Sequence, residues 1–162
     1  MYLKTTVIFL LLTVLPLISY SQNQKSEELA KFIITEATIN NEDVTEYHLE
    51  QSACIVFYSV KNDDLVYMAN YWEKNNTQSY GPMIARKTRK NKETEEDYKS
   101  DEFYFSWRYT NTYDGKIGTA KVALTKIYKP NGISFVVKII PENLDVIVYS
   151  GYMEGSIDFS NY

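Results

Sequence analysis

A succession of strand-like segments separated by very short turns constrains the fold of this chain more than any other feature. From Cys54 onward, runs of β-branched and aromatic residues alternate with turn sequences such as Asp114-Gly115 and Lys129-Pro130-Asn131-Gly132. Turns of this length and composition join neighbouring antiparallel strands, because parallel strands need a much longer crossover connection. The pattern therefore predicts an antiparallel meander in which consecutive strands lie side by side.

Eight segments of the chain have the composition of strands. They are residues 32–39, 54–60, 65–72, 78–88, 101–113, 116–128, 133–140 and 146–152. In the fourth, Gly81-Pro82 predicts a bulge or an edge position. An up-and-down meander of this size removes its exposed edges by closing on itself. We therefore expect a mainly β protein, an antiparallel meander of about eight strands closed into a small barrel; the alternative is an open sheet wrapped on a helix.

One short helix is predicted after the first strand, over residues 44–51. Asp43 and Glu46 have the spacing of a capping box, in which Asp43 takes the cap position. Ahead of the first strand, Ser26 has the side chain of a helix cap and is followed by Glu27, which predicts one short helical turn. From residue 54 on, we expect only strands and turns.

The two hairpin turns also predict which residues face one another. For the Asp114-Gly115 turn, taken as a two-residue loop, the inward pairs are Phe105–Leu124, Trp107–Val122 and Tyr109–Ala120. The same register places Arg108 opposite Lys121 on the polar face. For the next hairpin, the apolar pattern selects the pairs Leu124–Val137 and Val122–Ile139. One face of the three strands is thus continuous and apolar, as a half-buried sheet requires.

A run of hairpin-connected strands with a helix after the first resembles the lipocalin-like, or calycin-type, family of small β-barrels. The resemblance covers most of the chain past residue 21. It lies in the order of the elements, since the segment AKFIITEA at the first strand has no Gly-x-Trp pattern. It implies a closed barrel in which every strand is antiparallel to its neighbours.

Residues 1–21 have the composition of a secretory signal. A lysine near the start, a largely apolar run and two serines ahead of a cleavage site follow the usual pattern of such leaders. The apolar run is shorter than the roughly 20 residues that span a bilayer. We therefore expect cleavage near Ser21-Gln22, a single barrel domain over residues 22–162, and a periplasmic or extracellular protein with no stable membrane insertion.

Charge and cysteine content narrow the range of functions further. The formal net charge of −4 argues against general nucleic-acid binding, which usually requires a basic face. Cys54 is the only cysteine, so no intramolecular disulfide can form. Because free cysteine is among the most buried residue types, we expect Cys54 to be a small buried residue at the start of the apolar run CIVFY.

The sequence carries no catalytic signature. His48 is the only histidine, and because nothing marks a nucleophile beside it, we interpret it as a solvated or partly packed helix residue. One histidine and one cysteine do not make up a zinc site, and we expect neither a metal nor a cofactor. Glu36 is expected to point outward, because an unpaired buried carboxylate is unfavourable. An enzyme would require features such as two converging carboxylates, an arrangement that the fold sets.

Residues 86–102 form a charged segment, basic over residues 86–92 and acidic over residues 93–102. Such a segment is either a docking loop for a charged partner or a long, solvated hairpin connection. Charge runs usually belong to exposed loops, so we favour the solvated connection.

The leading hypothesis for function is a secreted or periplasmic barrel that binds a small apolar or amphipathic ligand and catalyses no reaction. The predicted ligand contacts are Trp72, Phe105, Trp107, Tyr109 and Asn111, the last near one mouth of the barrel. Small residues at positions 118–120 face these rings, and they either leave space for a ligand or only make room for the rings. The alternative is a non-enzymatic interaction protein with a solid core that acts through surface loops on an unknown protein partner.

Overall fold

The computed structural model describes residues 26–142 and 145–161. The predicted leader and its cleavage site fall within residues 1–25 and so lie outside these ranges. The elements are β1 (Ser26–Ile39), β2 (Glu42–Asp43), α2 (Thr45–Glu50), β3 (Ala53–Val60), β4 (Val66–Trp72), β5 (Thr77–Glu93), β6 (Lys99–Asn111), β7 (Ile117–Lys129), β8 (Gly132–Pro141), β9 (Ile147–Gly155) and the 3₁₀ helix η2 (Phe159–Asn161).

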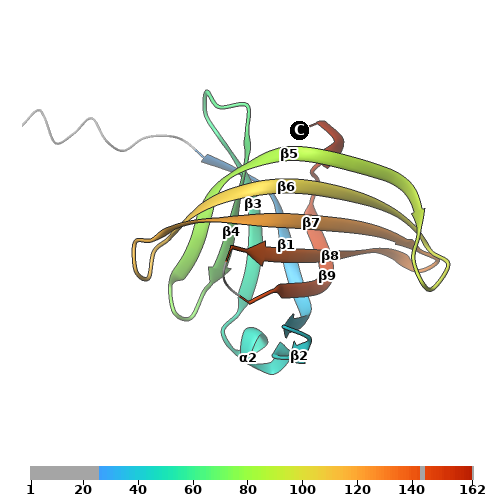
Figure 1. Cartoon of the computed structure of the whole chain (residues 1–162), viewed down its shortest axis with the longest axis horizontal. Helices are drawn as coiled ribbons and strands as arrows, with labels where there is room; N and C mark the ends of the chain where they lie inside the picture. Colours follow the sequence, from blue (N-terminus) through green and yellow to red (C-terminus); the bar gives the residue numbers. More distant parts are fainter. Residues whose placement is uncertain (1–25, 143–144, 162) are drawn as a thin grey trace, which may run out of the picture.

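The strands form one antiparallel sheet that closes on itself (Figure 1). Their order is β2-β1-β3-β4-β5-β6-β7-β8-β9, and β1 also pairs with β9. This last pairing joins the two ends of the meander and produces the predicted up-and-down barrel. Closure gives the outermost long strands a neighbour on each side, which an open sheet would lack.

Strand β1 begins earlier than predicted, because its first residues extend the pairing with β3, whereas the closing pairing with β9 starts at Ala30. Its first part pairs with β3 and its later part with β9. Ser26 therefore does not cap a helical turn; it is the first residue of the strand and pairs with Val60. A register shift between Ile34 and Glu36 marks a bulge, which bends the strand as it passes from one neighbour to the other. Glu36 is exposed, as predicted.

The short helix α2 follows β1 as predicted, but its N-terminus differs from the predicted capping box. Val44 occupies the cap position, and no side chain caps the helix. Asp43 lies one position too early, because β2 pairs it with Thr38 of β1. Its Oδ1 instead accepts a hydrogen bond from the backbone N–H of Thr45 at 2.9 Å. The predicted reciprocal contact with Glu46 does not form.

The hairpin between β6 and β7 has a wider loop than predicted. The Asn111 N–H donates to the Lys116 carbonyl at 2.8 Å, so residues 112–115 form the loop. Asn111 Oδ1 accepts from the Tyr113 N–H at 2.8 Å, and Asp114 Oδ1 accepts from the Lys116 N–H at 3.1 Å. These side-chain bonds stabilise the wider loop. The inward pairs become Phe105–Val122, Trp107–Ala120 and Tyr109–Gly118.

The predicted register of this hairpin is therefore wrong by two residues. Because the shift is even, the same side chains still face the barrel interior. Arg108 lies opposite Thr119 and avoids the like-charge pair that the predicted register required. The register of the β7–β8 hairpin is confirmed, with the pairs Leu124–Val137 and Val122–Ile139.

Gly81-Pro82 does not interrupt β5. Both residues pair with β4, and the register with β6 is the same on either side of them. The register shifts of β5 occur further along, after Ala85 and after Arg89. Gly81 has a different role: an added Cβ would lie 1.9 Å from the carbonyl oxygen of Arg108. Only glycine permits this close approach of two backbones.

Strands β5 and β6 extend beyond the barrel wall (Figure 1). The pairing of β4 with β5 ends at Met83, whereas β5 continues to Glu93 with β6 as its one neighbour among the described strands. The charged segment 86–102 is therefore mostly strand, and the connection between β5 and β6 is confined to residues 94–98. The predicted long connection is wrong, although the side chains of this part of β5 are exposed as predicted.

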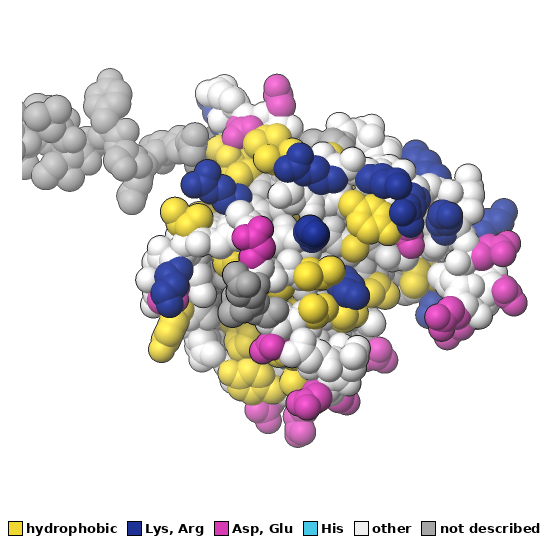
Figure 2. All heavy atoms as spheres, in the orientation of Figure 1, with side chains coloured by type: hydrophobic (Ala, Val, Ile, Leu, Met, Phe, Trp, Pro, Cys, Tyr) yellow, Lys and Arg dark blue, Asp and Glu magenta, His cyan; other side chains and the backbone are white. Residues whose placement is uncertain are grey.

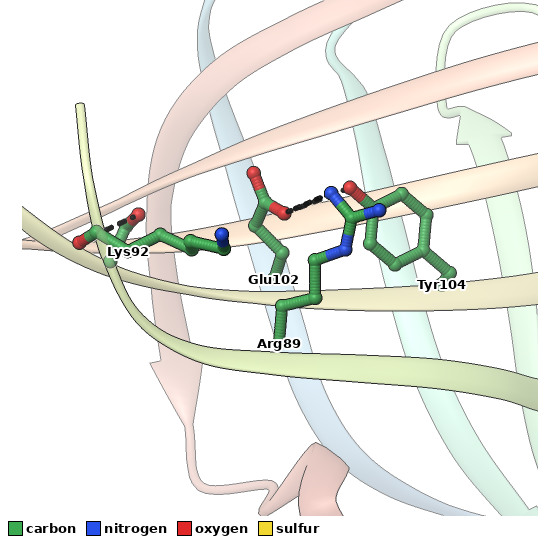
Figure 3. Close-up of polar contacts among 5 residues, drawn as sticks. Arg89, Lys92, Glu102 and Tyr104 are labelled. Atoms are coloured by element: carbon green, nitrogen blue, oxygen red, sulfur yellow. Dashed lines mark hydrogen bonds and ion pairs between the residues drawn. The ribbon is translucent and has the colours of Figure 1, made fainter. Parts of the chain in front are cut away.

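One cluster of contacts holds a basic side chain on this extension (Figure 3). Arg89 Nη1 lies 3.7 Å from Glu102 Oε2, and the Arg89 guanidinium lies 5.4 Å from the ring centre of Tyr104. The Tyr104 hydroxyl donates to Glu102 Oε2 at 2.9 Å, and this bond raises the pKa of Tyr104. Nearby, Ser100 Oγ donates to the Lys92 carbonyl at 3.5 Å. These contacts link β5 and β6 where β4 no longer supports them.

Apolar side chains fill most of the barrel interior. They include Ala30, Phe32, Ile34, Ile55, Phe57, Met68, Phe105, Trp107, Val122, Leu124, Val137, Ile139 and Tyr149. At one end, the buried side chain of Phe159 packs onto this core. Its ring centre lies between 5.1 and 6.0 Å from those of Phe57, Phe103 and Phe105. The C-terminal segment thus closes one end of the barrel with an aromatic plug.

Candidate ligand-binding site

The other end of the barrel holds an open cavity of about 720 Å³, which we call the mouth pocket. Here β4, β6 and β8 end, β5, β7 and β9 begin, and α2 packs against β1 and β3. The pocket is lined by Asn70, Trp72, Asn75, Thr77, Gln78, Ser79, Asn111, Tyr113 and Ile147. Its volume is within the range of small-molecule sites, roughly 300 to 1,000 Å³.

A row of polar side chains, the mouth row, crosses this pocket. Asn70 of β4 lies opposite Ser79 of β5, which in turn lies opposite Asn111 of β6. All three occupy the inward-facing positions of their strands, in step with the buried Met68 and Trp107 deeper in the barrel. Because side chains alternate between the two faces of a strand, the mouth row lies directly above the apolar core.

Two aromatic rings flank the mouth row. The ring centre of Trp72 lies 4.9 Å from that of His48 and 5.5 Å from that of Tyr47, both in edge-on geometry. Helix α2 thereby braces Trp72 at the end of β4. Tyr113, in the β6–β7 loop, is 83% exposed. The pocket therefore has one fixed ring and one ring that is free to adjust to a ligand.

His48 is buried beside the mouth pocket, more completely than the solvated or partly packed helix residue that was predicted. It is 1% exposed, because the inward face of α2 lies over the barrel opening. Its Nδ1 lies 3.0 Å from the carbonyl oxygen of Val44, so Nδ1 carries the proton and Nε2 is left as an acceptor. No described residue makes a hydrogen bond to Nε2. The ring also contacts Tyr149 edge-on, with 5.3 Å between the two ring centres.

Tyr149 connects the mouth row to this buried histidine. Asn70 Nδ2 donates to the Tyr149 hydroxyl oxygen at 3.3 Å. Burial raises the pKa of Tyr149 to about 12, because the phenolate form is disfavoured away from water. Asn70 Oδ1 is also buried, without a hydrogen-bond partner in residues 26–142 and 145–161. The floor of the pocket therefore contains polar groups whose hydrogen-bonding capacity is only partly used.

Four of the five predicted ligand contacts fall into two groups. Trp72 and Asn111 line the mouth pocket. Phe105 and Trp107 belong to the packed core, at 3% and 2% exposure. Trp107 Nε1 donates to the Gly81 carbonyl at 3.2 Å, which satisfies its one polar group within the protein.

Tyr109, the fifth predicted contact, is half-buried between the core and the mouth. Its ring centre lies 4.7 Å from that of Trp107. An added Cβ on Gly118 would lie 2.5 Å from the Tyr109 ring. Gly118 therefore makes room for the ring, and the ring takes up the space that the small residue leaves.

No family model, curated protein or solved structure matches this chain. The closed up-and-down barrel is consistent with the lipocalin-like resemblance of its element order. The interpretation of the mouth pocket therefore rests on its own geometry.

The sequence interpretation did not identify Asn70 and Ser79 as site residues. Both are polar residues at inward positions of strands whose deeper inward residues are apolar, and this exception to the alternation is the signal that points to them. Detecting it requires the register of three strands, which the sequence alone did not supply for β5. The buried His48 could not have been found this way, because its burial depends on how α2 packs.

Other reactive groups give no competing site. Among the described residues, no three His, Cys, Asp or Glu side chains gather where they could hold a metal ion. Cys54 is buried and unpaired, as predicted, and burial raises the pKa of its thiol. Within the part of the chain that the structure covers, no helix is long and apolar enough to cross a membrane.

Proposed function

We propose that this protein binds a small amphipathic molecule in the mouth pocket and catalyses no reaction on it. The observation that carries the proposal is an open cavity of about 720 Å³ at the end of a closed barrel. Closed barrels of this size are either filled by side chains or hold one small ligand. At one end Phe159 plugs the core, and the hollow beside it, about 360 Å³, has a largely polar lining; at the mouth, polar and aromatic side chains converge on the larger cavity.

The distribution of side chains favours an amphipathic ligand over a purely apolar one. Phe105 and Trp107 are already packed against other core residues, so they offer no apolar chamber. The groups that a ligand meets first are the amides and hydroxyl of the mouth row and the ring of Trp72. A molecule with both polar groups and apolar surface would match them. If the predicted leader directs export, this ligand is met in the periplasm or outside the cell.

A binding experiment with a reporter tryptophan tests the proposal. The chain has two tryptophans, and Trp107→Phe leaves Trp72 as the only one. We expect octyl β-D-glucoside, titrated below its micelle concentration, or 1-octanol to change Trp72 fluorescence in a saturable way. Ser79→Phe, which fills the pocket, should abolish the change.

Ser106→Phe is the matched control, since Ser106 lies in the same sheet but faces outward, opposite Lys121. It should leave the fluorescence change intact. The proposal would be overturned if neither probe gave a saturable change, or if Ser79→Phe and Ser106→Phe behaved alike while both remained folded.

The alternative, an interaction protein, is favoured by the exposed edge of β5 beyond Met83. Figure 2 shows Lys and Arg side chains along the upper rim of the molecule, where β5 runs. However, basic residues and bulges are also what protect an exposed strand edge from pairing with another chain. A polyglutamate peptide serves as the probe: binding that is lost in a Lys87→Glu/Lys90→Glu variant would favour this alternative, and no binding would exclude an acidic partner at this edge.

A further inference from the structure

We propose that the ligand of the mouth pocket is neutral and rich in hydroxyl groups, a sugar ring or a sugar-like polyol. This inference rests on the proposed function and specifies the chemical class of its ligand. Three features of the pocket carry it: the uncharged side chains of the described lining residues, the hydrogen-bonding groups of the mouth row, and the braced ring of Trp72.

The first feature is the neutrality of the pocket. No Asp, Glu, Lys, Arg or His is among the described residues that line it. The protein as a whole has many charged residues, with 17 Lys and Arg and 21 Asp and Glu, so this neutrality is local. A fatty acid, a phosphate ester or an amine would leave its charge without a partner here. The lining therefore selects an uncharged ligand.

The second feature is the kind of polar group that the ligand meets. The Ser79 hydroxyl can donate and accept, whereas the amides of Asn70 and Asn111 each use one group within the protein, Nδ2 of Asn70 toward Tyr149 and Oδ1 of Asn111 toward the Tyr113 N–H. The three residues lie on three adjacent strands, so the mouth row spans two inter-strand intervals, about 10 Å. Hydroxyl groups match such a row well, because each hydroxyl can donate and accept. An alcohol with one hydroxyl would use only one position of the row.

The mouth row also contains an acceptor that has no hydrogen-bond partner among the described residues. Asn70 Oδ1 is a buried acceptor with no hydrogen-bond partner within the described ranges. A buried acceptor without a partner is unfavourable. Because Asn70 lines the pocket, a turn of its side chain brings Oδ1 to a ligand hydroxyl, whereas an apolar ligand leaves this acceptor without a partner.

The third feature is the ring of Trp72. Tyr47 and His48 make T-shaped contacts that brace this ring before a ligand binds, and the ring also lines the pocket. The face of an aromatic ring carries partial negative charge and attracts the weakly positive C–H groups on the face of a sugar ring. A fixed ring beside a row of amides and hydroxyls thus offers both surfaces that a sugar presents, its C–H face and its hydroxyl rim.

Octyl β-D-glucoside has a sugar part and an alkyl part. Testing the two parts separately, as methyl glycosides and as 1-octanol, distinguishes this inference from the proposed function. Binding is measured by Trp72 fluorescence in the Trp107→Phe background, and by saturation-transfer NMR with the native chain. One arm uses a panel of neutral methyl glycosides with gluco, galacto, manno and N-acetylglucosamine configurations. The other arm uses 1-octanol. We expect at least one glycoside to bind in a manner that Ser79→Phe abolishes.

The mouth row predicts how variants should respond. Asn70→Leu keeps the size of the side chain and removes its polar groups, so we expect about tenfold weaker glycoside binding and little change for octanol. Ser79→Ala should weaken glycoside binding several-fold and is the milder variant if Asn70→Leu does not fold. Ser106→Ala, on the outer face of β6, is the matched control and should change neither.

Each outcome decides between the two proposals. If octanol binds at the pocket and no glycoside does, the sugar assignment is wrong while the binding function stands. If neither binds, both proposals fail. If a glycoside binds but Asn70→Leu and Ser79→Ala leave its affinity unchanged in folded protein, the mouth row is not the site, and the inference is overturned.

Discussion

At the scale of single residues, the inward face of the barrel changes from apolar to polar within one or two steps of strand alternation. Met68 and Trp107 face inward in the core, and Asn70 and Asn111 occupy inward positions nearer the mouth. The inward face of these strands is therefore apolar in the core and polar near the mouth. Tyr149 lies where the two meet, with a buried ring and a hydroxyl that contacts Asn70.

The ionisation of Tyr149 should make folding sensitive to alkaline pH. Burial raises the pKa of Tyr149 to about 12, whereas in the unfolded chain the group ionises near pH 10. The contribution of Tyr149 to stability is therefore complete below about pH 10 and is lost as pH rises to about 12, a change of about 3 kcal/mol. Urea unfolding across this interval measures it.

Tyr149→Phe should lose less stability than the native chain between about pH 10 and about pH 12. Tyr58 also has a pKa raised to about 12, so part of the pH dependence should remain in this variant. Identical pH profiles for Tyr149→Phe and the native chain would contradict the account.

His48 should contribute to stability mainly through its ring. His48→Ala removes a ring that is 1% exposed and packs against three aromatic neighbours, so we expect a loss of about 3 kcal/mol in the free energy of unfolding. His48→Phe keeps the ring and removes the unpartnered Nε2, so its stability should stay within about 1 kcal/mol of the native chain. Equal losses in the two variants, measured by urea unfolding, would show that the Nδ1 bond to Val44 dominates instead.

At the scale of elements, the C-terminal segment packs against one end of the barrel core. After β9 the chain turns back and places Phe159 of η2 against three phenylalanine rings of the barrel. Four aromatic side chains thereby pack together at this end of the core, and the hollow of about 360 Å³ beside them is lined in part by Lys90, Asp101 and Lys126. The two ends of one barrel thus differ in chemistry.

Removing the plug should destabilise the barrel strongly. Phe159→Ala is expected to lower the free energy of unfolding by about 3 kcal/mol, since a buried ring is lost and the end of the core is exposed. Asn161→Ala, an exposed position in the same 3₁₀ helix, should change it by less than about 0.5 kcal/mol. Equal stabilities of the two variants in urea unfolding would contradict the plug.

The elements show which parts of the fold the sequence could predict. The β7–β8 register was predictable, because Pro130-Asn131 forms a two-residue loop and the apolar pattern leaves one pairing. The β6–β7 register was not, because side-chain bonds of Asn111 and Asp114 widen the loop in a way that turn composition does not reveal. Similarly, the extension of β5 depends on pairing with β6, which a charged composition over residues 86–93 does not indicate.

At the scale of the whole molecule, closure of the meander was predictable and the location of the site was only partly so. Strand number and short turns led to the barrel. Trp72 and Asn111 were predicted as ligand contacts, Asn111 near one mouth, and both line the mouth pocket. Phe105 and Trp107 share the same inward face but lie deeper, and depth along a strand is set by the closure and stagger of the barrel.

The measurement that tests the account most directly is an NMR titration of the isotope-labelled protein with the tightest-binding methyl glycoside. The account predicts saturable shifts at the mouth, in the side-chain amide of Asn70, the indole N–H of Trp72 and the backbone N–H of Ser79. The signal of Phe159 at the opposite end should not move. Shifts gathered around Phe159, with none at Asn70 or Trp72, would contradict the account.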